Sequence, residues 1–394
     1  MSALTRIAIL TAVAASCCVV SARAELAPLP PQPADVAWPT SEWPTGPLPE
    51  GVDRAALDAA MADAFGQKAP GLGETREVVI ISGGMLVHEQ YGAGYNADMK
   101  LVSWSMAKSI TQALVGIASK QGKVNVDAPM GNPHWAATDK QAQIPWRTWL
   151  NMTDGMRYLE IEAKTIADSD ASRKLFGPGR LDVANYCSGL PYIHEPGTHW
   201  NYNSCGIVLT ADALTRAIVP NPESPQARRE AMLKWMHESL FDVIGIKPQP
   251  EFDAAGLYYG SALIYATARD FAKFGLLYLR DGMWDGQRVL PEGWVDFART
   301  PGKSENADIY GAGWWVSPAQ GDGKPYKSHI DTGQQRDAFS AEGFEGQFTL
   351  VVPSKDLIIV RLGFTPEKDL RTGAIRVWLG RVARAFPVAA KGTE

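Results

Sequence analysis

The run LVSWSMAKSITQALVG, from Leu101 to Gly116, places a serine and a lysine at the start of an expected helix. Ser105 stands three residues before Lys108, and residues three apart on a helix share one face. The lysine amine can therefore reach the serine hydroxyl and, when it is neutral, take the hydroxyl proton. A chain of this composition contains roughly one Ser-x-x-Lys by chance, so the motif needs support from other parts of the sequence.

The residues after the motif indicate that its helix is packed inside the protein. Ile110, Leu114 and Ile117 recur at helical spacing and form one apolar face. Ser105 then lies at the amino end of the helix, where free backbone NH groups and the helix dipole favour negative charge. Such a position suits a serine that attacks a carbonyl carbon.

Two downstream segments accompany the motif. Tyr202-Asn203-Ser204 follows a loop, and Gly343 to Pro353 (GFEGQFTLVVP) begins with two glycines and continues as an apolar strand. Together with the first motif, in this order, these segments resemble the serine β-lactamase and penicillin-binding protein superfamily. The resemblance is strongest to its class C-like branch of esterases and 6-aminohexanoate-dimer hydrolases. It covers nearly the whole chain and includes the following further stretches: Trp149 to Gly155, Ala266 to Tyr278, Gly311 to Trp315, and Gly346-Gln347.

The resemblance implies a role for each motif. Ser105 and Lys108 would be the nucleophile and its base, and Tyr202 would carry the proton to the leaving group with help from the positive charge of Lys108. The backbone NH groups of Ser105 and Gln347 would form the oxyanion hole. Gly346 would let the strand approach the substrate closely.

Two positions in these motifs have an alternative interpretation. Ser204 would hydrogen-bond Lys108 or the substrate, although an ordinary loop serine fits the sequence equally well. Gly343 and Gly346 also fit a bulged strand with no chemical role.

One motif departs from the family pattern. Where β-lactamases have Lys-Thr-Gly, which binds a substrate carboxylate, this chain has Phe344-Glu345-Gly346. Replacing a cation by phenylalanine and adding Glu345 disfavours anionic β-lactams. The sequence therefore predicts an esterase or amidase that acts on small neutral or cationic acyl compounds.

The order of helical and strand patterns predicts an α+β fold of the β-lactamase type. Its antiparallel sheet is expected to have helices on both faces and a mostly helical insert. The sheet subdomain is assigned to residues 51–118 and 256–394 and the insert to 119–255, which together make one catalytic domain at 51–394. The expected elements are a helix at 52–65, a hairpin at 78–91, a second hairpin at 347–362 and a helix at 367–385.

The first residues have the pattern of an export signal. Arg6 precedes an apolar run, and small residues up to Ala24 offer a cleavage site, so residues 1–24 are predicted to be a signal peptide. Export to the periplasm or medium, with no stable membrane span after cleavage, is favoured over lipoprotein anchoring at Cys17. Residues 25–50 contain eight prolines and are predicted to be extended, with Trp38 and Trp43 as anchors.

Cleavage would leave two of the four cysteines, Cys187 and Cys205. In an oxidising compartment they could form a disulfide. Two buried thiols that pack as small apolar groups are an equal alternative.

Composition and missing motifs exclude several protein classes. The formal charge is −5, or −7 after loss of Arg6 and Arg23 (−5 minus 2), which argues against nucleic acid as a partner. The sequence contains no G-x-S-x-G, H-x-H or H-E-x-x-H pattern, so neither an α/β-hydrolase nor a metal enzyme is expected, and no cofactor is predicted. His199 is interpreted as a loop histidine rather than a cleft residue. The rings of Trp314 and Trp315 are both expected to pack in the core. Alternatively, one of the two rings forms a wall of the acyl pocket.

Other functions remain as alternatives. One alternative is a D,D-peptidase or transacylase, which uses the same serine, lysine and tyrosine. A second alternative is weak β-lactamase activity on cell-wall-type substrates. A non-catalytic envelope binding protein is disfavoured because Ser105, Lys108 and Tyr202 are all present. The sequence makes no prediction of the acyl substrate or the oligomeric state.

Overall fold

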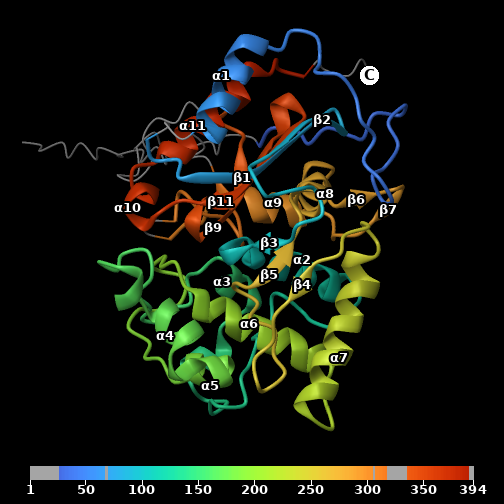
Figure 1. The fold of residues 1–394 in the computed structure, drawn as a ribbon. Helices are drawn as coiled ribbons and strands as arrows, with labels where there is room; N and C mark the ends of the chain where they lie inside the picture. The colour runs from blue at the N-terminus through green and yellow to red at the C-terminus, as the bar shows by residue number, and fades with distance from the viewer. Residues whose placement is uncertain (1–25, 67–69, 305–306, 317–334, 390–394) are drawn as a thin grey trace, which may run out of the picture.

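The computed structural model describes residues 26–66, 70–304, 307–316 and 335–389. Its main element is a six-stranded antiparallel sheet in the order β2-β1-β11-β10-β9-β8 (Figure 1). The strands are β1 (Glu74–Ser82), β2 (Met85–Tyr91), β8 (Trp315–Val316), β9 (Phe339–Gly343), β10 (Gln347–Val352) and β11 (Leu357–Phe364). The predicted signal peptide and Cys17 lie outside the described residues.

Both predicted hairpins are present. Gly83 and Gly84, which join β1 to β2, have φ values of +60° and +77°, so the turn has two adjacent left-handed residues as tight hairpin turns require. β10 and β11 form the second hairpin. β1 also pairs with β11, which brings the beginning and the end of the chain together in one sheet.

Both faces of the sheet are buried, and each belongs to a different core. Val78 and Ile80 of β1 pack on one side with α1 (Arg54–Phe65) and α11 (Ala374–Ala385). Val79 and Ile81 point the other way, into a larger core that includes α2 (Ala107–Lys120) and α8 (Ala268–Leu279). The fold is therefore α+β with helices on both faces of an antiparallel sheet, as predicted.

One predicted helix, that at 367–385, is wrong as a single element. The structure divides it into α10 (Glu367–Leu370) and α11, with Gly373 between them. Gly373 has φ +74°, a left-handed conformation that interrupts a helix.

The residues between α2 and α8 contain most of the remaining helices and form the lower half of the molecule in Figure 1. α6 lies at the centre of this insert and packs on α2, α3 and α5. A disulfide joins Cys187 of α5 to Cys205 of α6, the pair for which the sequence left two alternatives. The insert helices are α3 (Trp146–Leu150), α4 (Asp170–Phe176), α5 (Val183–Ser188), α6 (Ser204–Ile218) and α7 (Pro225–Met236).

Short strands and one helix complete the regular structure. A small sheet in the order β3-β5-β4 lies at the junction of the two parts, and β6 pairs with β7. These elements are β3 (Leu101–Val102), β4 (Gln249–Pro250), β5 (Ile264–Ala266), β6 (Met283–Trp284), β7 (Gln287–Arg288) and α9 (Trp294–Arg299).

Residues 26–50 run along the sheet subdomain with almost no regular structure. Trp38 contacts Trp284 with ring centroids 5.2 Å apart, and the Trp43 indole NH donates to the carbonyl of Arg269. The ammonium of Lys273 donates to the carbonyl of Thr40. The segment is thus fastened along its length. Among the helices that the structure describes, none is long and apolar enough to cross a membrane.

Candidate active site

The backbone around Ser105 differs slightly from the prediction that this serine begins a long helix. Ser105 lies in a short 3-10 turn, Trp104–Met106, and α2 begins only at Ala107. Trp104 has φ +42°, which is uncommon for a bulky residue and costs about 1–3 kcal/mol when the surroundings hold it. Its indole NH donates to Oε2 of Glu345 at 2.9 Å, which fixes the turn against the end of the β9–β10 connection.

Lys108 lies directly behind the serine. Its Nζ is 2.7 Å from Oγ of Ser105 and 3.1 Å from the carbonyl oxygen of Ser261. The side chain is 1% exposed, and burial lowers the pKa of Lys108 to about 8, although the negative charge of Glu160 opposes this. α2 is buried from Ala107 to Ala118, so the prediction of a single apolar face understated its burial.

Tyr202 approaches the same two groups from the insert. The Nζ of Lys108 lies 4.7 Å from the centroid of the Tyr202 ring, and the phenol hydrogen-bonds with Ser105. Burial, Tyr310 and Glu160 raise the pKa of Tyr202 well above its ordinary value. The tyrosine is therefore a neutral phenol at neutral pH.

The loop of Tyr202 is held by Asn203, to which the sequence analysis assigned no role. Asn203 caps α6 by accepting from the NH of Gly206 at 3.0 Å, and its amide donates to Asp154 at 3.0 Å. Burial raises the pKa of Asp154 to about 6. Ser204 is the first residue of α6 and lines the same pocket as Ser105. The Asn203 cap thus positions both neighbouring side chains.

The glycine-rich segment reaches the nucleophile through the end of β9. A Cβ on Gly343 would lie 2.2 Å from the carbonyl oxygen of Ser103, so this close approach requires glycine. Gly346 has φ +82° and also lines the pocket. Gln347 begins β10, and its side-chain amide exchanges hydrogen bonds with the backbone of Gly363 at 2.7 and 2.9 Å. Its backbone NH as an oxyanion donor stays a prediction.

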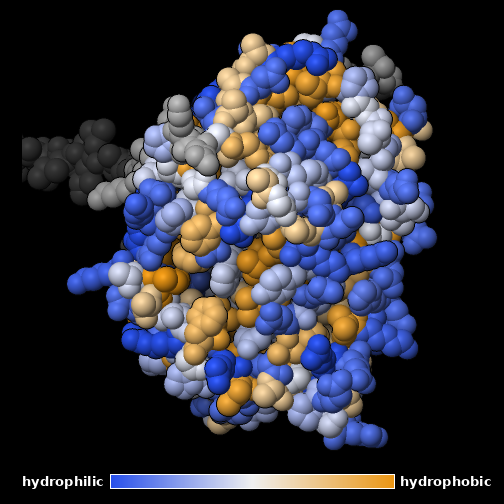
Figure 2. All heavy atoms as spheres, viewed as in Figure 1, coloured by the Kyte–Doolittle hydropathy of each residue, from blue (hydrophilic) through white to orange (hydrophobic). Residues whose placement is uncertain are grey.

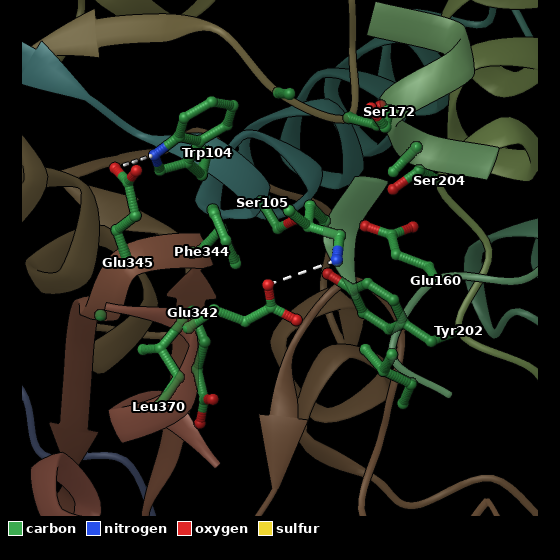
Figure 3. A pocket seen from close by; sticks show the side chains of 18 of the residues that line it. Trp104, Ser105, Glu160, Ser172, Tyr202, Ser204, Glu342, Phe344, Glu345 and Leu370 are labelled. Carbon is green, nitrogen blue, oxygen red and sulfur yellow. Dashed lines mark hydrogen bonds between the residues drawn. The ribbon is translucent and has the colours of Figure 1, made fainter. Parts of the chain in front are cut away.

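Ser105, Tyr202, Ser204 and Gly346 line one cavity of about 670 Å³ between the sheet subdomain and the insert. Figure 3 shows Ser105, Ser204, Tyr202 and Glu160 directed into the same space, with Trp104, Phe344 and Glu345 on the opposite side. Much of the lining is apolar, and it comes from both parts: Trp104, Ile161, Ile166, Leu175, Phe176, Trp315, Phe344, Phe348, Leu370 and Ile375. In Figure 2, hydrophobic residues interspersed with hydrophilic ones follow this boundary between α4 and α10.

Two aromatic predictions can be compared with this cavity. Trp314 is fully buried in the core, whereas Trp315 lines the cavity and stacks on Tyr202 with centroids 5.2 Å apart. His199 stacks on His194 at 4.2 Å and is not part of the lining, as its interpretation as a loop histidine requires.

Sequence reasoning missed several polar residues of this cavity, among them Glu160, Lys174 and Ser261. Glu160 and Lys174 belong to the insert, and Ser261 precedes β5. Their positions have no fixed spacing from the three motifs, so no pattern in the sequence indicated them. The part of the chain that the structure covers has no cluster of side chains able to hold a metal ion.

The fold and the grouping of serine, lysine and tyrosine define a class, the serine hydrolases built on a β-lactamase-like fold. The chain belongs to the Beta-lactamase family, whose family model matches residues 54–379. It is a serine hydrolase of the amide or ester type.

Several relatives support this assignment. The chain is 23% identical over 326 residues to a 6-aminohexanoate-dimer hydrolase of Paenarthrobacter ureafaciens, covering 78% of this chain and 79% of that protein. A putative 6-aminohexanoate-dimer hydrolase from Bacillus anthracis superposes with a TM-score of 0.63 at 19% identity, covering 92% of each chain. A class C β-lactamase from Rhodobacter sphaeroides gives a TM-score of 0.54 at 15% identity, covering 84% of this chain and 99% of that one.

Proposed function

We propose that the protein forms an acyl-enzyme on Ser105 and hydrolyses carboxylic esters or small amides. The observation that carries this proposal is the distance of 2.7 Å between a fully buried lysine amine and the serine hydroxyl. With a pKa of about 8, Lys108 is neutral in a useful fraction of molecules near neutral pH. A neutral amine at hydrogen-bond distance is a competent general base.

The reaction proceeds in two acyl-transfer steps. Lys108 takes the proton of Ser105 as Oγ attacks the carbonyl carbon, and the oxyanion is held by backbone NH groups, predicted to be those of Ser105 and Gln347. The bond to the leaving group then breaks, and the proton passes from Lys108 through the neutral phenol of Tyr202 to that group. Water attacks the acyl-enzyme by the same route in reverse, which releases the acid and restores Ser105.

The cavity supports a substrate with an apolar acyl or leaving group. The cations of its lining are already engaged. Arg376 pairs with Glu342, Arg371 pairs with Glu367 at 3.2 Å, and Lys174 donates to the hydroxyl of Ser261 at 2.7 Å. Phe344 and Glu345 stand where a β-lactamase has the cation that binds a carboxylate. Anionic β-lactams therefore gain little here, whereas neutral or cationic acyl compounds fit the lining.

The similarity to a 6-aminohexanoate-dimer hydrolase supports amides as substrates. A 6-aminohexanoate-dimer hydrolase acts, by its name, on a dimer of an amino acid. We therefore include small linear amides with apolar chains among the substrates, beside esters.

A fluorophosphonate probe and a substrate panel test this proposal. The wild type is expected to be labelled on Ser105 and to hydrolyse p-nitrophenyl butyrate faster than nitrocefin. Ser105→Ala and Lys108→Met are expected to lose labelling and at least about a thousandfold in turnover. Ser119→Ala and Lys120→Met, from the other end of α2, are the matched controls. Labelling that persists in Ser105→Ala, or faster turnover of nitrocefin, would contradict the proposal.

We also propose that the protein works outside the cytoplasm. The predicted signal at residues 1–24 and the disulfide between Cys187 and Cys205 support this, since disulfides persist in oxidising compartments. Mass spectrometry of the secreted or periplasmic fraction should find a mature chain that begins after Ala24. A chain that keeps residues 1–24 in the cytosol would contradict it.

A further inference from the structure

Two buried lysines meet at one residue of the cavity. Lys108 donates to the carbonyl oxygen of Ser261 at 3.1 Å, and Lys174 donates to its hydroxyl oxygen at 2.7 Å. Both lysine side chains are 1% exposed. Burying a single ammonium group is costly, and two such groups close together also repel each other. The proposed reaction uses only Lys108, so the second lysine requires a separate explanation.

The second lysine is delivered by an anchored piece of the insert. The carboxylate of Asp170 accepts from the NH of Leu159 at 2.8 Å, and the NH of Asp170 donates to the carbonyl of Leu159 at 2.8 Å. This pair of bonds joins the start of α4 to the segment before it. Glu160 directly follows Leu159, and Lys174 lies one helical turn after Asp170. The acid and the amine are thus brought to the cavity together.

Glu160 acts on both amines. Its carboxylate points into the cavity beside Ser105 and Tyr202 (Figure 3), and its buried Oε2 has no hydrogen-bond partner among the described residues. The negative charge raises the pKa of Lys108 and of Lys174, against the larger opposing effect of burial. The charge of Lys108 lowers the pKa of Lys174, which is about 7. Two amines this close titrate as a pair, so their apparent pKa values belong to both of them.

The other ionisable groups near this cluster include a third buried phenol, Tyr310, whose pKa is raised by burial and by the charges of Glu160 and Glu342. Tyr158 and Tyr202 are buried phenols with raised pKa values, and Glu342 on β9 faces Tyr202 but is paired with Arg376. On α4 itself, Asp170 is paired with Arg173. Glu160 is therefore the carboxylate whose charge raises the pKa of both lysines. The position of this charge relative to the two amines determines which of them is protonated.

We propose that Glu160 and Lys174 are positioning residues that set the protonation state of Lys108. Lys174 competes with Lys108 for a proton beside the negative charge of Glu160. Lys108 is therefore protonated in fewer molecules before the reaction. Once Lys108 has taken the proton of Ser105, Glu160 stabilises the ammonium until the proton passes to the leaving group. This inference rests on the proposed function, because it assumes that Lys108 is the base.

Two substitutions should move the pH dependence in opposite directions. Glu160→Gln removes the charge that raises the pKa of Lys108. The pH at which the labelling rate falls on the acid side of the profile, its acid limb, should therefore move to a lower value. Lys174→Met leaves a single amine to take up the proton that the pair shares beside Glu160, so the limb should move to higher pH. We expect shifts of about half a pH unit or more. The measurement is the labelling rate across pH, normalised to the labelled fraction at completion.

The controls are substitutions of exposed residues of the insert, Glu223→Gln and Lys164→Met. The midpoints of their pH profiles of labelling should match that of the wild type. A rate that falls equally at every pH, or midpoints that move in the same direction, would overturn the inference. Glu160 is only half-buried, so Glu160→Gln decides the question alone if Lys174→Met does not fold. A wild type that is not labelled at any pH would instead contradict the proposed function.

Discussion

Lys108 shows how a single residue joins stability to activity. Its amine is buried against the hydroxyl of Ser105 and the carbonyl of Ser261, and among the described residues no carboxylate lies within ion-pair distance of it. Burial therefore lowers its pKa to about 8 from an ordinary value of 10.5. The same burial that makes the amine a base at neutral pH also reduces the stability of the fold.

The pH dependence of acylation follows from this pKa. Because the neutral amine is the active form, kcat/KM for p-nitrophenyl butyrate should rise with pH, reach half of its maximum near pH 8 and level off at higher pH. Below that pH it should fall as Lys108 becomes protonated. A profile that is flat from pH 6 to about 9 would show that Lys108 is not the titrating base.

The stability effect of Lys108 has a defined sign. The folded-state pKa is below the unfolded value, so the unfolded chain binds more protons between about pH 8 and 10.5, and stability should rise with pH in that window. Below about pH 8 the full cost of burial is present. Lys108→Met should therefore melt at a higher temperature than the wild type at pH 7 while losing activity. A lower melting temperature at this pH would contradict the argument.

At the scale of elements, the site depends on how the insert holds Tyr202. α6 begins directly after the Tyr202 loop, and the disulfide from Cys205 fastens its first turn to α5. The cap by Asn203 and its bond to Asp154 fix the other side of the loop. The position of the phenol is thus set by backbone that is tied at two points.

Removing the disulfide should weaken both the fold and the site. The two cysteines are 18 residues apart, and closing a loop of that size is worth about 3 kcal/mol. Cys187→Ser combined with Cys205→Ser should lower the free energy of unfolding by roughly that amount in denaturant titrations. Ser188→Ala in α5 is a suitable control. An unchanged midpoint with and without reductant would show that the bridge adds no stability.

The elements also show what the sequence could and could not predict. Periodicity located both hairpins and the helix after Ser105, because apolar alternation and Gly83-Gly84 are local signals. It failed at residues 367–385, where only the left-handed conformation of Gly373 separates two helices. Ser105 and Lys108 could be predicted from their spacing, which reflects local helix geometry, whereas Tyr202 was predicted from the family resemblance. Glu160, Lys174 and Ser261 meet only through the tertiary fold, so no local pattern could reveal them.

For the whole molecule, the segment from residue 26 to 50 connects parts that are distant in sequence. Arg299 donates to the carbonyl of Ala27 at 2.6 Å, and Arg280 donates to Gln32 and Pro30. The Trp284 indole NH donates to the hydroxyl of Thr40 at 2.8 Å. These bonds satisfy buried donors of the sheet subdomain, and the prolines limit the freedom that the segment has when unfolded.

Deleting this segment should therefore destabilise the protein without altering its chemistry. A chain that begins at Gly51 should lose several degrees or more of melting temperature, since Arg280, Arg299 and Trp284 lose partners. Its pH profile of labelling should remain unchanged, because none of these groups lines the cavity. A truncated chain as stable as the mature protein would contradict the role given to the segment.

The most direct test of the account is to trap the covalent intermediate. The enzyme is mixed with p-nitrophenyl butyrate, quenched in acid within the first turnovers, digested and measured by mass spectrometry, with Tyr202→Phe included to slow release of the acyl group. The account predicts a butyryl group on the peptide that contains Ser105, absent from Ser105→Ala. Undiminished ester hydrolysis by Ser105→Ala, or an acyl group on a different residue, would contradict it.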